Sequence, residues 1–384
     1  MTLIVYTYAA YPLALVLWVR IRSRTAKDEG QAAAFTGSFS IILCAYNEAE
    51  RIATRINELS KLVRANSRLG EIIVISDGSM DNTAAVARAT GCGATVIEMP
   101  ENLGKAAALT LGCAAARGDI LVFADARQHW ENDTLERLLG NFSRPEVGAV
   151  SGELNLGSST TTLTGVGLYW RYERWIRRLE GLVHSTVGVS GSISAVRRLL
   201  FRPIPTGLVL DDLYWPMCVV LGGRRVVHDD RAKAFDVLPP NAKDELRRKI
   251  RTLSGNFQLM MALPAVLLPI RNPIWLQFVS HKVLRLLVPW LLIALLATSA
   301  MLNSLLFRGL FWSQVAFYGL AALHFMYAGS AASRRLPLLS RLTGTVASFV
   351  LLNTAAWLGF WIWLLGRTGL SWRKVRYRMP GDTV

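Results

Sequence analysis

Three acidic residues of this sequence, Glu48, Asp77 and Asp125, each follow a short apolar run. Ligands of open α/β sheets bind beyond the carboxyl ends of the strands, so three such side chains are expected at one rim. A single acidic residue in this position is equally well explained as the cap of the next helix. Because the pattern recurs after three runs, a binding site is the better explanation.

Lys105 adds a positive charge to this rim. The segment Asn102-Leu103-Gly104-Lys105 opens a helical pattern, and the free N–H groups of a helix start can bind phosphate together with a lysine. A solvated lysine at a helix start is the competing interpretation. Carboxylates and cations at neighbouring positions suit a nucleotide whose diphosphate carries a divalent ion.

Asp211 and Asp212 form an adjacent acidic pair that opens a helical pattern over residues 213–221. Two neighbouring carboxylates repel each other, which can raise the pKa of one toward neutrality and suit it to general-base catalysis. The alternative is an acidic cap at a helix N-terminus. From the residues alone, both interpretations remain open.

The elements that must position these residues alternate between strand-like and helical patterns within residues 36–258. The strands are predicted at 38–44, 71–76, 94–98 and 119–124, and helices are predicted to begin near Glu48, Asp81, Lys105 and Asn132. Such alternation predicts a parallel α/β sheet. No glycine fingerprint of the GxGxxG type occurs, which argues against a Rossmann oxidoreductase.

The composition indicates a membrane protein. Of the 384 residues, 52% are hydrophobic and 18% charged, whereas a soluble domain carries about a quarter charged residues. An ordinary cytosolic enzyme and a disordered chain are therefore excluded. The net charge of +16 predicts an anionic partner, and the usual nucleic-acid motifs do not occur, so we expect no nucleic acid. The four cysteines are scattered and indicate neither a disulfide framework nor a metal site.

Membrane-length apolar runs lie at both ends of the chain. Residues 1–24 are predicted to be an uncleaved transmembrane anchor, and the arginines that follow it place the next domain, residues 36–258, in the cytosol of an inner or plasma membrane. Residues 259–282, interrupted by prolines, are predicted to be an interfacial segment.

Residues 283–366 are predicted to hold about three transmembrane helices, with runs at 283–307, 311–332 and 344–365, before a basic tail at 367–384. Three late spans would place this tail outside, against the positive-inside rule. Either one late run is re-entrant or an earlier segment, 257–278, crosses as well.

A helical pattern at residues 169–184 has an apolar stripe with arginines on another face. The stripe comprises Leu168, Tyr172, Trp175, Leu179 and Leu182. A basic amphipathic helix with tryptophan suits a membrane surface. The alternative is a helix that faces the protein core and leaves its basic face in solvent.

Four segments in order, SIILCAYNEAERI, IIVISDGSMDNT, ENLGKAAALTLG and ILVFADARQ, resemble the inverting nucleotide-sugar glycosyltransferases of family 2. The resemblance continues through GVSGSISAVRR, LVLDDLYWP and RRKIRTLSGNFQ, and the membrane-bound branch with cellulose, hyaluronan and poly-N-acetylglucosamine synthases is the most similar. It implies a glycosyltransferase A-type fold, with a Rossmann-like mixed sheet, over residues 38–258.

The resemblance implies roles for the residues at the strand ends. Lys105 would approach the donor pyrophosphate, and uridine and ribose would be held by Ala45, Asn47, Glu48 and Asp77.

The resemblance also implies a metal site. Asp125 matches the first Asp of the DxD motif and would bind Mg²⁺ or Mn²⁺, with His129 as a candidate second ligand. Arg127 stands where the second Asp is expected, and the other interpretation is that Arg127 itself contacts phosphate.

On the acceptor side, the resemblance implies that Asp212, next to Asp211, is the catalytic base, and that Gly191 and Ser192 lie beside the acceptor. Arg251 would support the donor diphosphate. It is the residue kept from the family's QxxRW motif, whose Gln and Trp are absent here. Because processive synthases typically keep that Trp, its absence argues against a polymerase.

The expected function is inverting transfer of a hexosyl or N-acetylhexosaminyl group from a UDP-linked donor to a membrane-held glycan or lipid-linked acceptor, in exopolysaccharide or cell-envelope glycan synthesis. One alternative is a processive β-polysaccharide synthase that also translocates its polymer. Another is a membrane transporter with a nucleotide-sensing domain. The apolar runs lack acidic residues, which argues against an ion-coupled transporter.

Overall fold

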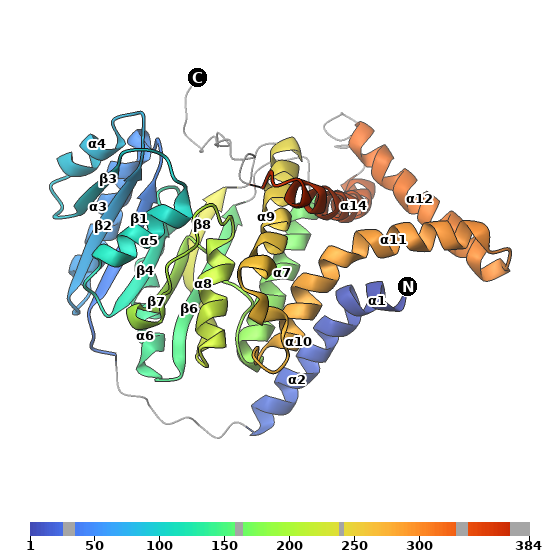
Figure 1. Cartoon of the computed structure of the whole chain (residues 1–384), viewed down its shortest axis with the longest axis horizontal. Helices are drawn as coiled ribbons and strands as arrows, with labels where there is room; N and C mark the ends of the chain where they lie inside the picture. The colour runs from blue at the N-terminus through green and yellow to red at the C-terminus, as the bar shows by residue number, and fades with distance from the viewer. Residues whose placement is uncertain (26–34, 158–163, 238–241, 328–336, 369–384) are drawn as a thin grey trace.

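The sheet that positions the acidic residues has eight strands in the order β3-β2-β1-β4-β7-β6-β8-β5 (Figure 1). The computed structural model describes residues 1–25, 35–157, 164–237, 242–327 and 337–368. The strands are β1 Phe39–Ala45, β2 Gly70–Asp77, β3 Thr95–Met99, β4 Ile120–Asp125, β5 His129–Trp130, β6 Val147–Gly157, β7 Ile193–Arg197 and β8 Arg225–Val237.

The four predicted strands are parallel neighbours, as expected. Ile41 of β1 is in register with Ile72 of β2 on one side and with Val122 of β4 on the other. The second half of the sheet is mixed, because β7 is antiparallel to β4 and β6, whereas β6 and β8 are parallel. The predicted α/β fold with a mixed sheet is confirmed.

Helices cover both faces of this sheet. One face carries α3 Ala49–Ala65, α4 Thr83–Ala89 and α6 Thr134–Gly140, and the other carries α5 Lys105–Ala115 and α8 Asp211–Leu221. In α3, Ile52, Ile56 and Leu59 are fully buried, at the spacing that places apolar residues on one helical face. Short 3₁₀ turns occur at η2 Asn141–Ser143, η3 Arg198–Leu200 and η4 Pro264–Leu267.

Further helical segments, several of them long, lie beside the sheet domain. They are α1 Thr2–Val5, η1 Tyr6–Ala10 and α2 Tyr11–Thr25, then α7 Thr164–Val183 and α9 Ala242–Ala262, then α10 Trp275–Phe278, η5 Val279–Val283, α11 Leu284–Met301, α12 Leu305–Tyr327 and α14 Pro337–Leu364. In Figure 1, α7 and α9 stand between the sheet and the other long helices.

Within the described residues, three helices are long and apolar enough to cross a membrane: Thr2–Ile21, Trp275–Met301 and Leu342–Leu364. The second begins well before the predicted run at 283–307, because Ile274 already caps a helix that continues through η5. The predicted interfacial segment, 259–282, is thus divided between the end of α9, the η4 turn and the start of this helix.

The helix α12 covers much of the predicted run at 311–332 but is not among these three, and residues 328–332 lie outside the described ranges. The number of late spans therefore stays a prediction. Of the predicted basic tail, residues 369–384 also lie outside the described ranges.

The amphipathic helix predicted at residues 169–184 corresponds to α7, and its apolar stripe was only partly right. Leu179 is buried, but Leu168, Trp175 and Leu182 are exposed. The buried face is rotated toward Ile176, which packs with Leu179 against the N-terminal helix. Helix α7 therefore packs within the protein on one side, and part of the predicted stripe faces outward.

Polar contacts also connect the N-terminal helix to α7. The hydroxyl of Tyr11 donates to Glu180 Oε1 at 2.6 Å, and His281 Nδ1 lies 2.8 Å from the same oxygen. His281 Nε2 lies 3.0 Å from Glu173 Oε2. These contacts, made by buried side chains, join the first helix, α7 and the helix that contains His281.

Candidate active site

One cavity of about 1380 Å³ lies where the parallel strands end. Ala45, Asp77 and Asp125 are the last residues of β1, β2 and β4, and all three line it. Asp212 of α8 and Arg251 of α9 line the same cavity. The structure thus brings together residues that are far apart along the chain, as predicted.

Asp77 holds the loop that precedes α5. Its two carboxylate oxygens accept hydrogen bonds from the backbone N–H groups of Leu103 and Gly104, at 2.9 and 3.0 Å. The Asn102 side-chain amide donates to Asp77 Oδ2 at 3.2 Å. Burial raises the pKa of Asp77, against the lowering effect of the two backbone donors. Through these hydrogen bonds, Asp77 holds the loop that immediately precedes Lys105.

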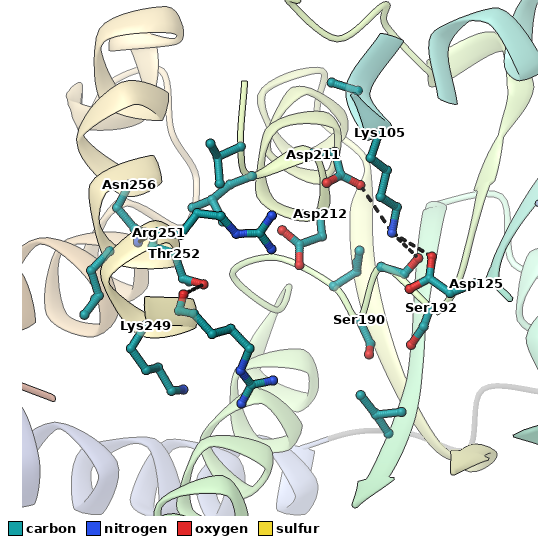
Figure 2. A pocket seen from close by; sticks show the side chains of 18 of the residues that line it. Lys105, Asp125, Ser190, Ser192, Asp211, Asp212, Lys249, Arg251, Thr252 and Asn256 are labelled. Atoms are coloured by element: carbon teal, nitrogen blue, oxygen red, sulfur yellow. Dashed lines mark hydrogen bonds and ion pairs between the residues drawn. The ribbon is translucent and has the colours of Figure 1, made fainter. Parts of the chain in front are cut away.

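Lys105 lies between two carboxylates of the cavity. Its Nζ donates to Asp125 Oδ1 at 2.8 Å and lies 4.0 Å from Asp211 Oδ2 (Figure 2). Burial lowers the pKa of Lys105, but the two carboxylates outweigh it and raise the pKa above its ordinary value. Lys105 is therefore a cation that contacts both the β4 end and the start of α8.

The acidic pair at the start of α8 is held in an environment that favours protonation. Burial raises the pKa of Asp211 to about 6; Lys105 opposes this, and the Asp212 and Asp125 carboxylates add to it. Burial also raises the pKa of Asp212, against nearby cations that include Lys105 and Arg251. A carboxyl with a raised pKa is suited to accept a proton near neutral pH.

The backbone of Gly191 approaches these side chains closely. A Cβ at this position would lie 3.3 Å from Asp212 Cβ, 3.5 Å from Lys105 Nζ and 3.9 Å from Asp211 Oδ2. Ser192 also lines the cavity, and its backbone oxygen accepts a hydrogen bond from Trp130 Nε1 at 3.2 Å. Both residues predicted for the acceptor thus line the cavity, and Gly191 borders the acidic pair.

Arg251 stands on the opposite side of Asp212 from Lys105 and Asp125 (Figure 2). It comes from α9, whose next arginine toward the N-terminus, Arg248, forms a bidentate ion pair with Glu245 at 3.0 Å for each bond. Arg248 is thus engaged by a carboxylate of its own helix. The contact of Arg251 with the donor diphosphate stays a prediction.

All predicted site residues line the cavity except Asn47 and His129. Asn47 adopts a left-handed backbone conformation with φ of 53°, and its Oδ1 accepts a hydrogen bond from Met80 N at 2.8 Å, which connects the loops after β1 and β2. Glu48, at the cavity wall, forms an ion pair with Arg51 at 3.5 Å.

His129 does not line the cavity that Asp125 lines. Its side chain is 70% exposed and its Nδ1 lies 3.0 Å from Glu58 Oε2. The reason is the short strand β5, which pairs with β8 and turns this side chain away from the cavity. Metal binding by His129 beside Asp125 stays a prediction.

Arg127, at the position of the expected second Asp, is held by a residue that sequence reasoning missed. Its Nε and Nη2 donate to the two carboxylate oxygens of Asp236, at 2.8 and 2.7 Å, and the Gln128 amide donates to Asp236 at 2.8 Å. Asp236 comes from β8 and lines the cavity. Only the strand order reveals this pairing, because the two residues are distant in sequence.

The described residues contain no group of three or more His, Cys, Asp or Glu side chains placed to hold a metal ion. Asp125 can supply one carboxylate: its Oδ1 is taken by Lys105, and its Oδ2 has no hydrogen bond to any residue in the described ranges. A divalent ion at this position would depend on other ligands, such as those of a bound diphosphate.

Residues 40–204, which include the strand ends and Gly191, match the family described as Glycosyl transferase family 2. This part of the chain is a glycosyl transferase family 2 domain. The chain is also similar to poly-beta-1,6-N-acetyl-D-glucosamine synthases. For that of Staphylococcus aureus (strain COL) the identity is 24% over 230 residues, 58% of this chain and 55% of the relative. The synthase of Staphylococcus epidermidis is 22% identical over 248 residues, which cover 62% of this chain and 59% of that relative.

The matched region thus spans little more than half the length of these relatives. Among solved structures, a mannosyltransferase from Pyrobaculum calidifontis in complex with GDP-Man and Mn²⁺ is similar over nearly the whole chain. Its TM-score is 0.68 at 20% identity, covering 95% of this chain and 99% of the other. At this identity the likeness shows the fold, a glycosyltransferase A-type domain with attached helices.

Proposed function

We propose that this family 2 domain transfers a sugar from a nucleotide-linked donor to a hydroxyl group of a membrane-held acceptor, with inversion at the anomeric carbon. One observation supports this most directly: Asp211 and Asp212 share a cavity with Lys105 and Asp125. A carboxyl pair with raised pKa values thus lies beside a lysine that can neutralise phosphate.

In the proposed reaction, the acceptor hydroxyl oxygen forms a bond to the anomeric carbon while the bond from that carbon to the diphosphate oxygen breaks. Asp212 accepts the hydroxyl proton, and the nucleoside diphosphate leaves with the bonding electrons. Lys105 neutralises the charge that develops on the leaving diphosphate. Attack from the opposite face inverts the anomeric carbon, and the new linkage is β.

The donor is proposed to be a UDP-sugar, with its nucleoside near Ala45, Glu48 and Asp77 at the ends of β1 and β2. The structural relative from Pyrobaculum was solved with GDP-Man and Mn²⁺. Guanosine-linked donors therefore belong in any screen of this protein.

A divalent ion, Mg²⁺ or Mn²⁺, is proposed to accompany the donor. Asp125 would supply one ligand and the diphosphate oxygens others, because His129 faces Glu58 instead. When bound, the ion would neutralise diphosphate charge, which adds to the effect of Lys105.

The acceptor is proposed to be held by the bilayer, with the catalytic domain on the cytosolic side of an inner or plasma membrane. Tyr8, Leu286 and Leu352 support this, because they line the same cavity and each belongs to one of the three membrane-length helices. Polysaccharide or cell-envelope glycan synthesis is the proposed setting, in keeping with the names of the curated relatives.

A donor screen tests this function. Purified full-length protein in detergent is incubated with a bacterial lipid extract and, in turn, with UDP-glucose, UDP-N-acetylglucosamine and GDP-mannose. Release of nucleotide and the length of any product are measured. We expect release from one donor, a single added sugar and loss of release in Asp212→Asn. Absence of release from every donor would contradict the proposal, and a long polymer would favour a processive synthase.

A further inference from the structure

The cavity continues beyond Asp212 into the region of the membrane-length helices. Tyr8, Leu286 and Leu352, one from each of the three helices, line this end. A molecule that fills it would contact the acidic pair at one end and bilayer-length helices at the other. This geometry fits a head group that enters from the bilayer better than a soluble sugar.

Three cations that act electrostatically on one another line the same cavity: Arg177 of α7, Lys249 of α9 and Lys282 of η5. We call them the acceptor-side cations. Neither Arg177 nor Lys282 forms an ion pair or hydrogen bond with any residue in the described part of the chain. Arg177 and Lys282 both act electrostatically on Asp212. Positive charge is therefore concentrated next to the proposed base.

The positive charge of Lys249 is only partly balanced by a neighbouring carboxylate. Its Nζ lies 3.8 Å from Glu245 Oε1, a carboxylate that already forms the bidentate pair with Arg248. Burial lowers the pKa of Lys249 to about 8; Glu245 opposes this, while Arg248, Arg177 and Lys282 lower it further. The ammonium also lies over the Tyr169 ring, 4.9 Å from its centroid.

Arg285, which also lines the cavity, has two N–H groups that are free to donate hydrogen bonds to a ligand. Its side chain is only 10% exposed and forms an ion pair with Glu173, yet its Nε and Nη2 have no hydrogen-bond partner among the described residues. Buried donors and cations without partners are unfavourable, because they have lost water and gained nothing in return. An anion bound here would supply the missing partner.

The donor diphosphate is not the anion expected at these cations. Figure 2 shows Lys105 and Asp125 on one side of Asp212 and Lys249 on the other. The ends of β1, β2 and β4, where the donor is proposed to bind, lie on the Lys105 side. The acceptor-side cations therefore face whatever approaches Asp212 from the helices.

We propose that the acceptor is a lipid whose head group carries phosphate, that Arg177, Lys249 and Lys282 bind this phosphate, and that its hydrocarbon chain runs along Tyr8, Leu286 and Leu352. The phosphate is an anchor and not the attacking group, because Asp211 and Asp212 would repel an anionic oxygen. The attacking oxygen is a hydroxyl further along the head group, which loses its proton to Asp212. This inference rests on the proposed function.

Binding without donor tests the site. The probes are a polyprenyl monophosphate, the matching polyprenol and inorganic phosphate, each added to the full chain in dodecyl maltoside and followed by calorimetry. We expect the polyprenyl monophosphate to bind at least about tenfold more tightly than either other probe. Equal binding of the polyprenol, or equal binding of inorganic phosphate, would overturn the proposal, the latter by assigning the site to a soluble anion.

Variants of the cations test the site, with a control on the same helix as Arg177. Arg177→Gln and Lys282→Gln are each expected to weaken binding of the polyprenyl monophosphate by roughly tenfold, the effect of losing one charged contact. Arg177→Lys should recover part of it. Arg178→Gln is the control, because Arg178 is 60% exposed and pairs with Asp230. Unchanged binding in both Arg177→Gln and Lys282→Gln would overturn the proposal.

The two proposals can fail separately. If no donor is consumed but the polyprenyl monophosphate binds through Arg177, the lipid-phosphate site stands and the proposed transfer fails. If sugar is transferred while the phosphate-bearing lipid binds no better than the polyprenol, the transfer stands and this inference fails. In either case we expect Arg177→Gln to bind the donor as tightly as the unmodified protein. Loss of donor binding in this variant would mean that Arg177 contacts the donor.

Discussion

The Nζ of Lys105 lies 2.8 Å from Oδ1 of Asp125, so the cation at the start of α5 is held at the end of β4. The same ammonium is 4.0 Å from Asp211 Oδ2. One lysine thus connects the strand ends, where the donor is proposed to bind, with the acidic pair proposed to activate the acceptor. The two halves of the proposed reaction are electrostatically linked through this residue.

Replacement of Lys105 by methionine tests that link. A hydrogen bond to a charged group contributes about 1.5–3 kcal/mol, so kcat/KM for the donor should fall roughly 10- to 150-fold. The control is Lys61→Met, at an exposed position of α3. Steady-state kinetics of nucleotide release measure both. Equal kinetics in the two variants would show that Lys105 does not contact the donor.

The acidic pair predicts an acid limb in the pH profile. A base must be deprotonated to accept a proton, and burial raises the pKa of Asp211 to about 6 and also raises that of Asp212. The rate of transfer should therefore fall with falling pH at values above the ordinary range of an aspartate. In Asp211→Asn the remaining carboxyl loses a repelling neighbour, so the limb should move to lower pH. A profile that is flat down to pH about 4, the ordinary value for an aspartate, would contradict the assignment.

Gly191 predicts a steric effect on the acceptor. A methyl group there would lie 3.3 Å from Asp212 Cβ and 3.5 Å from Lys105 Nζ, in space the acceptor is proposed to approach. Gly191→Ala should lower kcat/KM for the acceptor by about tenfold or more while the protein stays folded. Gly140→Ala is the control, because no atom lies within 4 Å of a Cβ at that position. Similar acceptor kinetics in both variants would mean that the acceptor does not pass Gly191.

Metal binding is predicted to require the nucleotide. Asp125 offers one carboxylate at the proposed position, and one carboxylate binds Mn²⁺ only weakly unless diphosphate oxygens complete the set of ligands. Electron paramagnetic resonance of free Mn²⁺ should show little binding to the protein alone and clear binding when UDP or GDP is added. Tight binding to the nucleotide-free protein would reveal ligands other than Asp125. Asp125→Asn should abolish the nucleotide-dependent binding.

The sequence predicted the first half of the sheet because its signals are local. Each of the strands β1 to β4 is a short apolar run followed by a helix start, and parallel order brings Asp77 and Asp125 to one rim. The second half depends on pairing between distant segments, such as Arg127 with Asp236 across β5 and β8. No local pattern indicates such a contact, so Asp236 was missed and the contact of His129 with Glu58 was not predicted.

The acceptor-side cations were missed for a related reason. Arg177 belongs to a helix whose arginines were read as a solvated or membrane-surface face, and helix periodicity alone does not identify the neighbour of each face. The structure places α7 between the sheet and the apolar helices, so Arg177 lines the cavity while its neighbour Arg178 stays exposed. Lys282 gave a faint signal, as a cation at the start of an apolar run.

The most direct measurement compares donor binding and sugar transfer in Asp212→Asn with the same change at Asp230, which is 40% exposed and, like Asp212, follows another aspartate in the chain. If Asp212 is the base, its amide variant should bind the donor with a dissociation constant within about threefold of the unmodified protein, while transfer falls roughly 10²- to 10⁴-fold. Asp230→Asn should leave both unchanged. Transfer by Asp212→Asn at more than a tenth of the unmodified rate would contradict the account.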